Sequence, residues 1–199
     1  MRSAAFLDRD GVITEDVHYP EAGEWEAPMR PADVALRPGA VAGLARLAAF
    51  GHKLILVSNQ GAYAKGKASL AALWQVHLRV VELLAAHGIG FDECFYSYTH
   101  PEGVVPHASG PSLERKPSPY FLLVAAARHD LDLGHSWMIG DRDSDIACGK
   151  AAGTRTIFVR NPHARGQSGA GADAAVDDLG AAAGIVAGGA GGIADARAT

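Results

Sequence analysis

Two aspartates separated by one residue form the most informative motif of the sequence. Asp8 and Asp10 stand in the run Phe6–Val12 (FLDRDGV), where an apolar strand is expected to end. Side chains two apart on a strand project from the same side, so these carboxylates would repel each other without a cation. Mg²⁺ suits such a pair, because it prefers oxygen ligands and is often held by carboxylates together with a substrate phosphate. One aspartate could then act as nucleophile while the other transfers a proton, as phosphoryl transfer through a covalent intermediate requires.

The Asp-x-Asp-Gly pattern also has two simpler interpretations. It opens calcium-binding loops and ordinary Asx turns. A calcium loop is excluded, because no glutamate occupies the bidentate position and the segment follows a strand, not a helix. The turn interpretation remains open on this motif alone.

Three further polar motifs stand at the expected ends of secondary-structure elements. The expected strand Lys53–Val57 stops at Ser58–Gly61 (SNQG), which supplies a hydroxyl and two amides before a turn residue. Arg115–Pro117 (RKP) precedes an expected helix, and the short apolar run Trp137–Ile139 leads into Gly140–Asp145 (GDRDSD). The chain therefore presents, in order, two aspartates, a hydroxyl, a lysine and two more aspartates.

This order of motifs resembles the haloacid dehalogenase (HAD) superfamily of aspartyl-phosphate phosphatases, from about Phe6 to about Val176. The four motifs are specific together, although each alone is not. Within the superfamily, three features are most similar to the D-glycero-D-manno-heptose 1,7-bisphosphate phosphatases. They are the sequence LDRDGVI, the motif SNQ followed by Ala64–Gly66 (AKG), and His100–Glu102 (HPE) before RKP. Histidinol-phosphate phosphatases are the nearest relatives of that group.

The resemblance implies a role for each candidate residue. Asp8 would be the nucleophile and Asp10 the general acid and base, and Asp8, Asp10 (through its backbone carbonyl) and Asp141 would hold Mg²⁺. Ser58 would bind the phosphoryl oxygens, and Lys116 would offset their charge. The remaining candidates would contact the substrate or organise the site: Asn59, Lys65, Arg115, Arg142 and Asp145. An arginine fork among them suits a second phosphate or a polyol.

Several of these residues also have a purely structural interpretation. Lys116 could be a solvated lysine before a helix, and Ser58 could only turn the chain. Asp145 could be an acidic residue that the helix dipole favours at a helix N-terminus. The combination of motifs favours the catalytic interpretation for all three.

A zinc loop is the one place where the sequence departs from these relatives. They usually carry a cysteine and a histidine before His-Pro, and two cysteines before Arg-Lys-Pro. The equivalent positions lack good zinc ligands: Ser97, Thr99, Ser112 and Glu114. Cys94, His100 and His107 lie nearby but make a poor structural zinc set. We therefore expect Mg²⁺ without zinc, and a loop that is ordered by other means and can differ in specificity.

Length and composition predict one soluble enzyme domain. The chain has 199 residues, a formal net charge of -4 and two cysteines. The charge gives no global attraction to nucleic acid or anionic membranes, and two cysteines predict no disulfide framework. Asp8 comes too early for a signal peptide, and no apolar run has the roughly 18 residues that a membrane span needs. We expect a cytoplasmic monomer whose partner is a small phosphorylated metabolite, not a nucleic acid or a membrane.

Strands alternate with helices along the chain, which predicts an α/β fold. We expect three layers in a Rossmann-like HAD arrangement, with helices on both faces of a central parallel sheet and no large cap domain. The domain should span residues 1–187, with a flap without regular structure at 15–36 and a substrate loop at 97–115. Residues 188–199 are rich in glycine and alanine and should form a flexible tail.

Cap signals predict where three of the helices begin. Ser69 should cap a long helix that reaches His87. Ser118 should cap the next, with Pro119 at its first helical position. Asp143 or Ser144 should cap a helix that ends near Gly153.

Three functions remain after this reasoning. The first is a Mg²⁺-dependent phosphatase of a small sugar phosphate, with heptose 1,7-bisphosphate and its 7-phosphate preferred. The second keeps the chemistry but acts on histidinol phosphate or another small phosphomonoester. The third is a phosphate-binding regulatory protein without turnover, against which the complete set of catalytic residues argues. A nucleic-acid 3'-phosphatase uses the same motifs, but the acidic balance and the lack of a basic stripe count against it.

Overall fold

A parallel β-sheet forms the centre of the molecule. The computed structural model describes residues 2–21 and 23–191. In this part of the chain, six strands pair in the order β5-β4-β1-β6-β7-β8, and all neighbours are parallel. Their bounds are β1 Ala4–Leu7, β4 Lys53–Asn59, β5 Glu93–Ser97, β6 Trp137–Gly140, β7 Arg155–Val159 and β8 Ala174–Val176.

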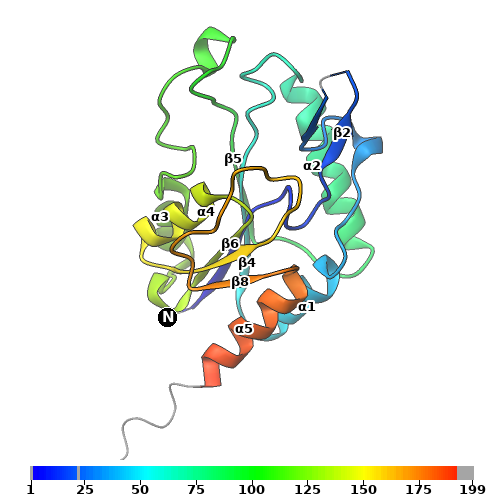
Figure 1. Ribbon diagram of the computed structural model, residues 1–199. Coiled ribbons are helices and arrows are strands. Elements are labelled where there is room, and N and C mark those ends of the chain that lie inside the picture. The colour runs from blue at the N-terminus through cyan, green and yellow to red at the C-terminus, as the bar shows by residue number, and fades with distance from the viewer. Residues whose placement is uncertain (1, 22, 192–199) are drawn as a thin grey trace, which may run out of the picture.

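Helices cover both faces of this sheet, so the predicted three-layer α/β architecture is confirmed. The described helices are α1 Ala40–Ala49, α2 Leu70–Ala85, α3 Tyr120–His129, α4 Asp143–Ala152 and α5 Leu179–Gly191. Figure 1 shows α1 and α5 side by side on one face and α3 and α4 on the other. Alternation along the buried strand β1 explains the two cores: Ala5 and Leu7 pack with α1, α2 and α5, whereas Phe6 packs with α3 and α4.

The sequence places the beginning of α2 correctly but misplaces the beginnings of α3 and α4. The Ser69 hydroxyl accepts a hydrogen bond from the amide of Ala72, as predicted for a cap. Pro119 itself is the N-cap of α3, because its ψ of 3° keeps it outside the helix, and Ser118 lies one residue too early. The N-cap of α4 is Arg142, not Asp143 or Ser144.

The segment 15–36 is not the irregular flap that the sequence suggested. It contains the antiparallel strands β2 (Val17–Tyr19) and β3 (Glu24–Glu26), followed by a short 3₁₀ helix η1 (Pro31–Asp33). The other described 3₁₀ helices are η2 (Pro106–Ala108) and η3 (Leu133–His135). Strands of three residues are too short for alternation to reveal them, which explains the difference. We call 15–36 the flap hairpin below.

The end of the chain also differs from expectation. Residues 188–191 continue α5, where a flexible tail was expected, and the rest of that predicted tail, 192–199, lies outside the described residues. Helix α5 is anchored because Leu179, Ala182 and Val186 are buried against the sheet and α1. Within the described residues, no helix is both long and apolar enough to cross a membrane.

Candidate active site

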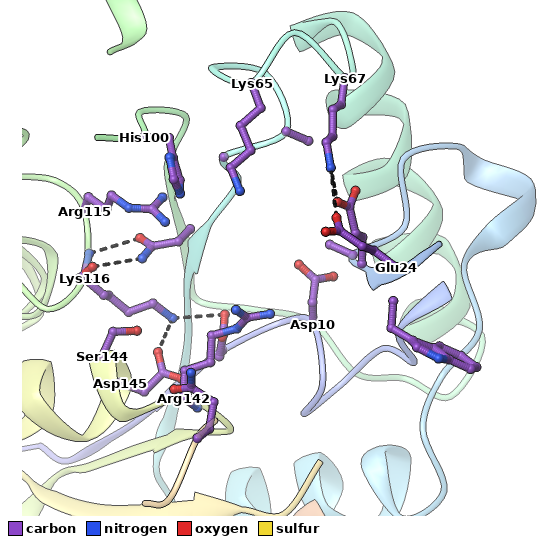
Figure 2. Close-up of a pocket in the computed structure, with 18 residues that line it drawn as sticks. Asp10, Glu24, Lys65, Lys67, His100, Arg115, Lys116, Arg142, Ser144 and Asp145 are labelled. Atoms are coloured by element: carbon purple, nitrogen blue, oxygen red, sulfur yellow. Dashed lines mark hydrogen bonds and ion pairs between the residues drawn. The ribbon is translucent and has the colours of Figure 1, made fainter. Parts of the chain in front are cut away.

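The predicted motifs meet at the carboxyl edge of the sheet, where β1, β4 and β6 end. A cavity of 440 Å³ opens there, and Figure 2 shows side chains from several loops pointing into it. Eight of the ten predicted residues line it: Asp8, Asp10, Asn59, Lys65, Arg115, Lys116, Arg142 and Asp145. The other two, Ser58 and Asp141, are buried next to it. Parallel strands bring their carboxyl ends to the same edge, so residues far apart in sequence converge.

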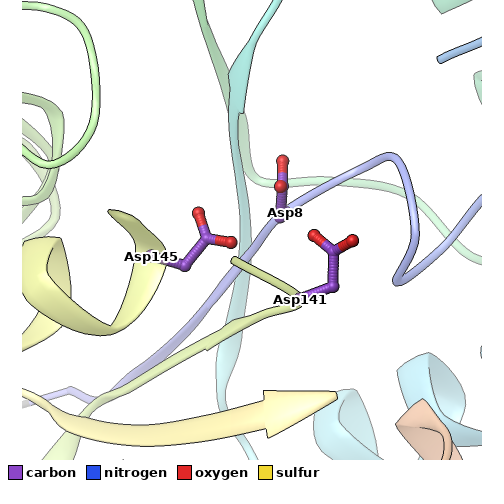
Figure 3. A group of neighbouring side chains, drawn as sticks. All are labelled: Asp8, Asp141 and Asp145. Carbon is purple, nitrogen blue, oxygen red and sulfur yellow. The ribbon is translucent and has the colours of Figure 1, made fainter. Parts of the chain in front are cut away.

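Three aspartates form a buried acidic cluster at the base of the site. Asp8, Asp141 and Asp145 each offer a carboxylate oxygen, and these atoms lie within 4.8 Å of one another (Figure 3). Burial, together with the charges of the other two, raises the pKa of Asp141 well above its usual value. A divalent cation would remove this repulsion.

The acidic cluster suits Mg²⁺ by its chemistry. All donors are hard oxygens, and one oxygen of Asp141 is buried without a hydrogen-bond partner among the described residues. The other oxygen of Asp141 accepts a hydrogen bond from Asn161 Nδ2 at 2.8 Å. One oxygen is therefore held by the protein, and the other remains available to a metal ion.

Lys116 is the buried cation that balances this cluster. Its Nζ lies 2.6 Å from Asp145 Oδ1 and 3.0 Å from Asp8 Oδ1, and it donates to the carbonyl of Val57 at 2.7 Å. Burial lowers the pKa of Lys116, but the two carboxylates outweigh burial and raise it above the usual value. The interpretation of Lys116 as a solvated lysine is therefore wrong, because its side chain is only 2% exposed.

Asp145 faces Lys116 and lies in the first turn of α4. Burial raises the pKa of Asp145 to about 6, against the opposing effect of Lys116. Its second oxygen accepts a hydrogen bond from the backbone amide of Arg142 at 3.0 Å, at the start of α4. The structural and catalytic interpretations of this residue are therefore compatible.

The side chain of Asp10 does not point in the direction that strand alternation predicts, beside that of Asp8. Strand β1 ends at Leu7 and the chain turns at Gly11, whose φ is +79°, so the alternation that would align Asp10 with Asp8 does not continue. The carboxylate of Asp10 instead faces Arg9, with Nε at 2.8 Å and Nη2 at 3.1 Å. Burial opposes ionisation, but Arg9 and the hydrogen-bond donors around Asp10 outweigh it and lower the pKa of Asp10. The side chain of Asp10 is thus outside the acidic cluster, and Asp145 stands there in its place.

Ser58 and Asn59 are the last two residues of β4, and their side chains form hydrogen bonds with different partners. The hydroxyl of Ser58 accepts a hydrogen bond from Gln60 Nε2 at 2.9 Å. Asn59 uses both polar atoms on the backbone of Lys116, because Nδ2 donates to its carbonyl and Oδ1 accepts from its amide, each at 3.0 Å. We therefore expect Asn59 to fix the loop that carries Lys116 rather than to contact the substrate.

Cationic side chains line the outer part of the cavity. Lys65, Arg115 and Arg142 are three of them (Figure 2), and they lie near His100, whose pKa is lowered by burial and by the charges of Lys65 and Arg115. Arg115 donates one hydrogen bond to the carbonyl of Thr99 at 2.8 Å, which fixes its guanidinium at the rim. These groups concentrate positive charge where an anionic substrate would enter.

The flap hairpin closes the opposite side of the cavity. Lys67 forms ion pairs with Glu24 and Glu26, which join the hairpin to the segment that precedes α2. The indole of Trp25 stacks on His163, with ring centroids 3.6 Å apart. The hairpin is therefore tied to two loops of the core domain.

Hydrogen bonds hold the loop from 97 to 115, which contains the positions Ser97, Thr99, Ser112 and Glu114 that were considered as zinc ligands. Ser97 and Thr99 bond to each other through their hydroxyls at 3.0 Å. The amides of Val104 and Val105 donate to the carbonyl of Ala64 at 2.7 and 3.1 Å. The side chains at these positions do not fit a zinc site, and the loop docks on the turn after β4.

Three residues of the site were not predicted from the sequence. Arg9 and Gln60 stand inside recognised motifs, but nothing in their spacing predicts that both would be buried against Asp10. Asn161 bonds to Asp141 and also to Asp16 Oδ2, at 2.7 Å. It follows β7, and its position just beyond a strand end was the signal that could have found it.

A family comparison agrees with this fold and site. Residues 113–182 match the model of the HAD-hydrolase-like family, and this range contains Lys116, Asp141 and Asp145. Fold and site together define a phosphatase of the HAD type. Similar proteins narrow the class further.

Two curated relatives and one solved structure are all named as heptose bisphosphate phosphatases. The chain is 37% identical over 150 residues to the D-glycero-beta-D-manno-heptose-1,7-bisphosphate 7-phosphatase of Mesorhizobium japonicum, covering 75% of the chain and 65% of that protein, just under two thirds. It is also 37% identical over 163 residues to the D-glycero-D-manno-heptose-1,7-bisphosphate 7-phosphatase of Thermosynechococcus vestitus, covering 80% of the chain and 79% of that protein. The structure of D,D-heptose 1,7-bisphosphate phosphatase from B. bronchiseptica, complexed with magnesium and phosphate, matches with a TM-score of 0.77 and 26% identity, covering 95% and 99% of the two chains. The chain belongs to this heptose-bisphosphate phosphatase family of the HAD superfamily.

Proposed function

We propose that the protein is a Mg²⁺-dependent phosphomonoesterase that removes the 7-phosphate of D-glycero-D-manno-heptose 1,7-bisphosphate. The observation that carries this proposal is the buried cluster of Asp8, Asp141 and Asp145, with Lys116 between Asp8 and Asp145, at the base of an open cavity. Such a cluster presents one nucleophilic carboxylate, cation ligands and a fixed positive charge to a phosphoryl group. The names of the relatives support the choice of substrate.

Asp8 has the geometry of a nucleophile. Its Oδ1 accepts from the backbone amide of Arg9 at 2.8 Å and lies 3.0 Å from Lys116 Nζ, so the second oxygen is free to attack. Attack forms a bond between this oxygen and phosphorus, and the bond from phosphorus to the sugar oxygen breaks. Asp10 must be protonated for this step, although its hydrogen-bond donors outweigh burial and lower its pKa. It gives the proton to the leaving oxygen and then takes one from the water that releases phosphate from Asp8.

Mg²⁺ would be held by Asp8, Asp141 and the backbone carbonyl of Asp10, and when bound it would offset charge on the phosphoryl oxygens. Asp145 Oδ1 lies 2.6 Å from Lys116 Nζ and thereby orients the ammonium of Lys116 toward Asp8. The hydroxyl of Ser58 and the ammonium of Lys116 would contact the phosphoryl oxygens.

The rim cations support a substrate with a second anionic group. Lys65, Arg115 and Arg142 line the cavity together with Asp8 and Asp145 of the acidic cluster. Arginine binds phosphate through two parallel N–H groups, so a bisphosphate fits this distribution of charge better than a monophosphate. We also propose that the enzyme works as a cytoplasmic monomer on this small metabolite, without nucleic-acid or membrane partners and without zinc.

Phosphate release in the presence of Mg²⁺ tests the proposal. The panel contains both anomers of heptose 1,7-bisphosphate, histidinol phosphate, other sugar phosphates and a 3'-phosphorylated oligonucleotide. We expect preference for a heptose bisphosphate, abolished in Asp8→Asn and unchanged in the control Asp130→Asn, which makes the same change at an exposed position. Preference for histidinol phosphate would show instead that the protein has the activity of the histidinol-phosphate phosphatases. Phosphate binding without turnover would contradict the enzymatic proposal.

A further inference from the structure

Arg9 lies between the two proposed catalytic aspartates in the sequence, and its side chain is buried against Asp10. Its side chain is fully buried, and among the described residues its ion pair is with Asp10. A guanidinium is expensive to bury, so such a residue is retained where its hydrogen bonds do specific work. Arg9 Nε and Nη2 donate to the two oxygens of Asp10, which fixes the plane of that carboxylate.

Gln60 connects this pair to the site of phosphate binding. Gln60 is buried, with only 2% of its surface exposed. Nε2 donates to Asp10 Oδ2 at 2.6 Å and to Ser58 Oγ at 2.9 Å, and Oε1 accepts from Arg9 Nη2 at 2.8 Å. One amide therefore links the proton-transfer residue, the phosphate-binding hydroxyl and the buried cation.

Asp10 is consequently held by four side-chain donor groups. Oδ1 accepts from Arg9 Nε and from Thr14 Oγ1, the latter at 3.0 Å, and Oδ2 accepts from Arg9 Nη2 and from Gln60. A carboxylate with both oxygens engaged cannot rotate without breaking several bonds at once. Its direction relative to Asp8 is therefore set by these neighbours and not by β1, which ends before both aspartates.

We infer that Gln60 and Arg9 are positioning residues that aim Asp10 at the leaving oxygen of the substrate. The inference rests on the proposed phosphatase function and extends it to residues that do not touch the reacting atoms. Through Gln60, the hydroxyl that binds the phosphoryl group and the acid that protonates the leaving group keep a fixed separation. Removing Gln60 would misdirect the proton, whereas Ser58 and Lys116 would still be present to bind the phosphoryl group.

Leaving-group dependence separates this role from a structural one. A nitrophenolate leaves without a proton, whereas an alkoxide or an unsubstituted phenolate needs one. Loss of proton transfer therefore slows poor leaving groups selectively, whereas damage to the nucleophile or to phosphate binding slows all substrates alike. The readout is the rate of the first turnover with enzyme in excess, because later turnovers also depend on Asp10 as base.

The experiment compares phenyl phosphate, 4-nitrophenyl phosphate and the preferred sugar phosphate in Gln60→Met. We expect a loss of about 100-fold for the sugar phosphate and a clear loss for phenyl phosphate, but less than about threefold for 4-nitrophenyl phosphate. The control Gln75→Met makes the same change on the exposed face of α2 and should match the wild type on all three. Ser58→Ala should slow all three equally.

Two conservative variants cover the case in which Gln60→Met does not fold. Gln60→Glu keeps the shape but replaces the donor to Asp10 by an acceptor, and Arg9→Lys keeps the charge but not the two-pronged bond. Both should show the same selective loss, and Arg9→Lys the smaller one. Equal losses across the leaving groups in all folded variants would overturn the inference while leaving the phosphatase function intact. A wild type that releases phosphate from none of the substrates would instead refute the proposed function.

Discussion

Replacing Lys116 by methionine should lower the free energy of unfolding by about 3–5 kcal/mol. Methionine keeps the length of the side chain but removes the ammonium that lies between Asp8 and Asp145. The carbonyl of Val57 also loses its donor. Three buried carboxylates would then share one pocket, in which Arg142 Nε lies 4.0 Å from Asp141 Oδ1.

The magnitude follows from the two distances. With an effective dielectric constant of about 20, unit charges 3.0 and 2.6 Å apart attract by about 5.5 and 6.4 kcal/mol, respectively. Desolvation offsets much of this attraction, and breaking a buried pair by removing one partner typically costs about 3–5 kcal/mol. We expect a loss in this range for the free energy of unfolding, a large share of the about 5–15 kcal/mol of a typical domain.

Urea denaturation at pH 8 in the presence of a chelator measures the loss. The matched control is Lys65→Met, at a lysine that lines the same cavity and has no ion pair with the described residues, for which we expect at most about 0.5 kcal/mol. Mg²⁺ should restore part of the loss in Lys116→Met, because a ligand at 100 times its dissociation constant stabilises by about 2.7 kcal/mol. A loss below about 1 kcal/mol in chelator would show that Lys116 and the two carboxylates are not a buried charged network, and the reasoning would fail.

Three further predictions concern the metal, its support and the core. A chelator should stop turnover, and Mg²⁺ should restore it; restoration by zinc alone would contradict the hard-oxygen site. Asn161→Ala should weaken Mg²⁺ binding by about 10-fold or more, measured by calorimetry, because Asp141 loses the donor that orients it; unchanged affinity would remove Asn161 from the site. Burial and the charge of Arg9 lower the pKa of His77 below its usual 6.5, so the folded state binds fewer protons than the unfolded state near and below pH 6.5. Stability should therefore fall as pH drops below 6.5, and less so in His77→Gln; equal slopes in urea midpoints would refute this.

The sequence was sufficient for the sheet and for most of the site because both follow from strand ends. Apolar runs mark β1, β4 and β6, and the polar residues directly after them must meet at one edge in a parallel sheet. Asp8 and Asp141 both stand directly after predicted strands, and the resemblance assigned both to the metal site; in the structure their carboxylate oxygens lie within 4.8 Å of each other. Lys116 was placed by resemblance and is brought there by the backbone contacts with Asn59.

The remaining differences have local causes. Cap positions shifted by one residue in α3, since Pro119 takes the N-cap itself, and α4 begins after Arg142. The flap hairpin was not predicted from the sequence because its strands have only three residues each. The orientation of a buried side chain depends on partners distant in sequence: Gln60 reaches Asp10 across fifty positions, and no periodicity encodes such a contact.

Gly11 makes the orientation of Asp10 and the metal site depend on each other. Its φ of +79° favours glycine, and a Cβ there would lie 2.2 Å from Asp141 Oδ2 and 2.4 Å from Asn161 Nδ2. The turn that directs Asp10 toward Arg9 thus also lets the backbone pack directly on the carboxylate of the acidic cluster. A larger residue at this position would displace Asp141 and Asn161 and strain the turn that follows Asp10. The two halves of the proposed chemistry, phosphoryl transfer at Asp8 and proton transfer at Asp10, therefore share one structural requirement.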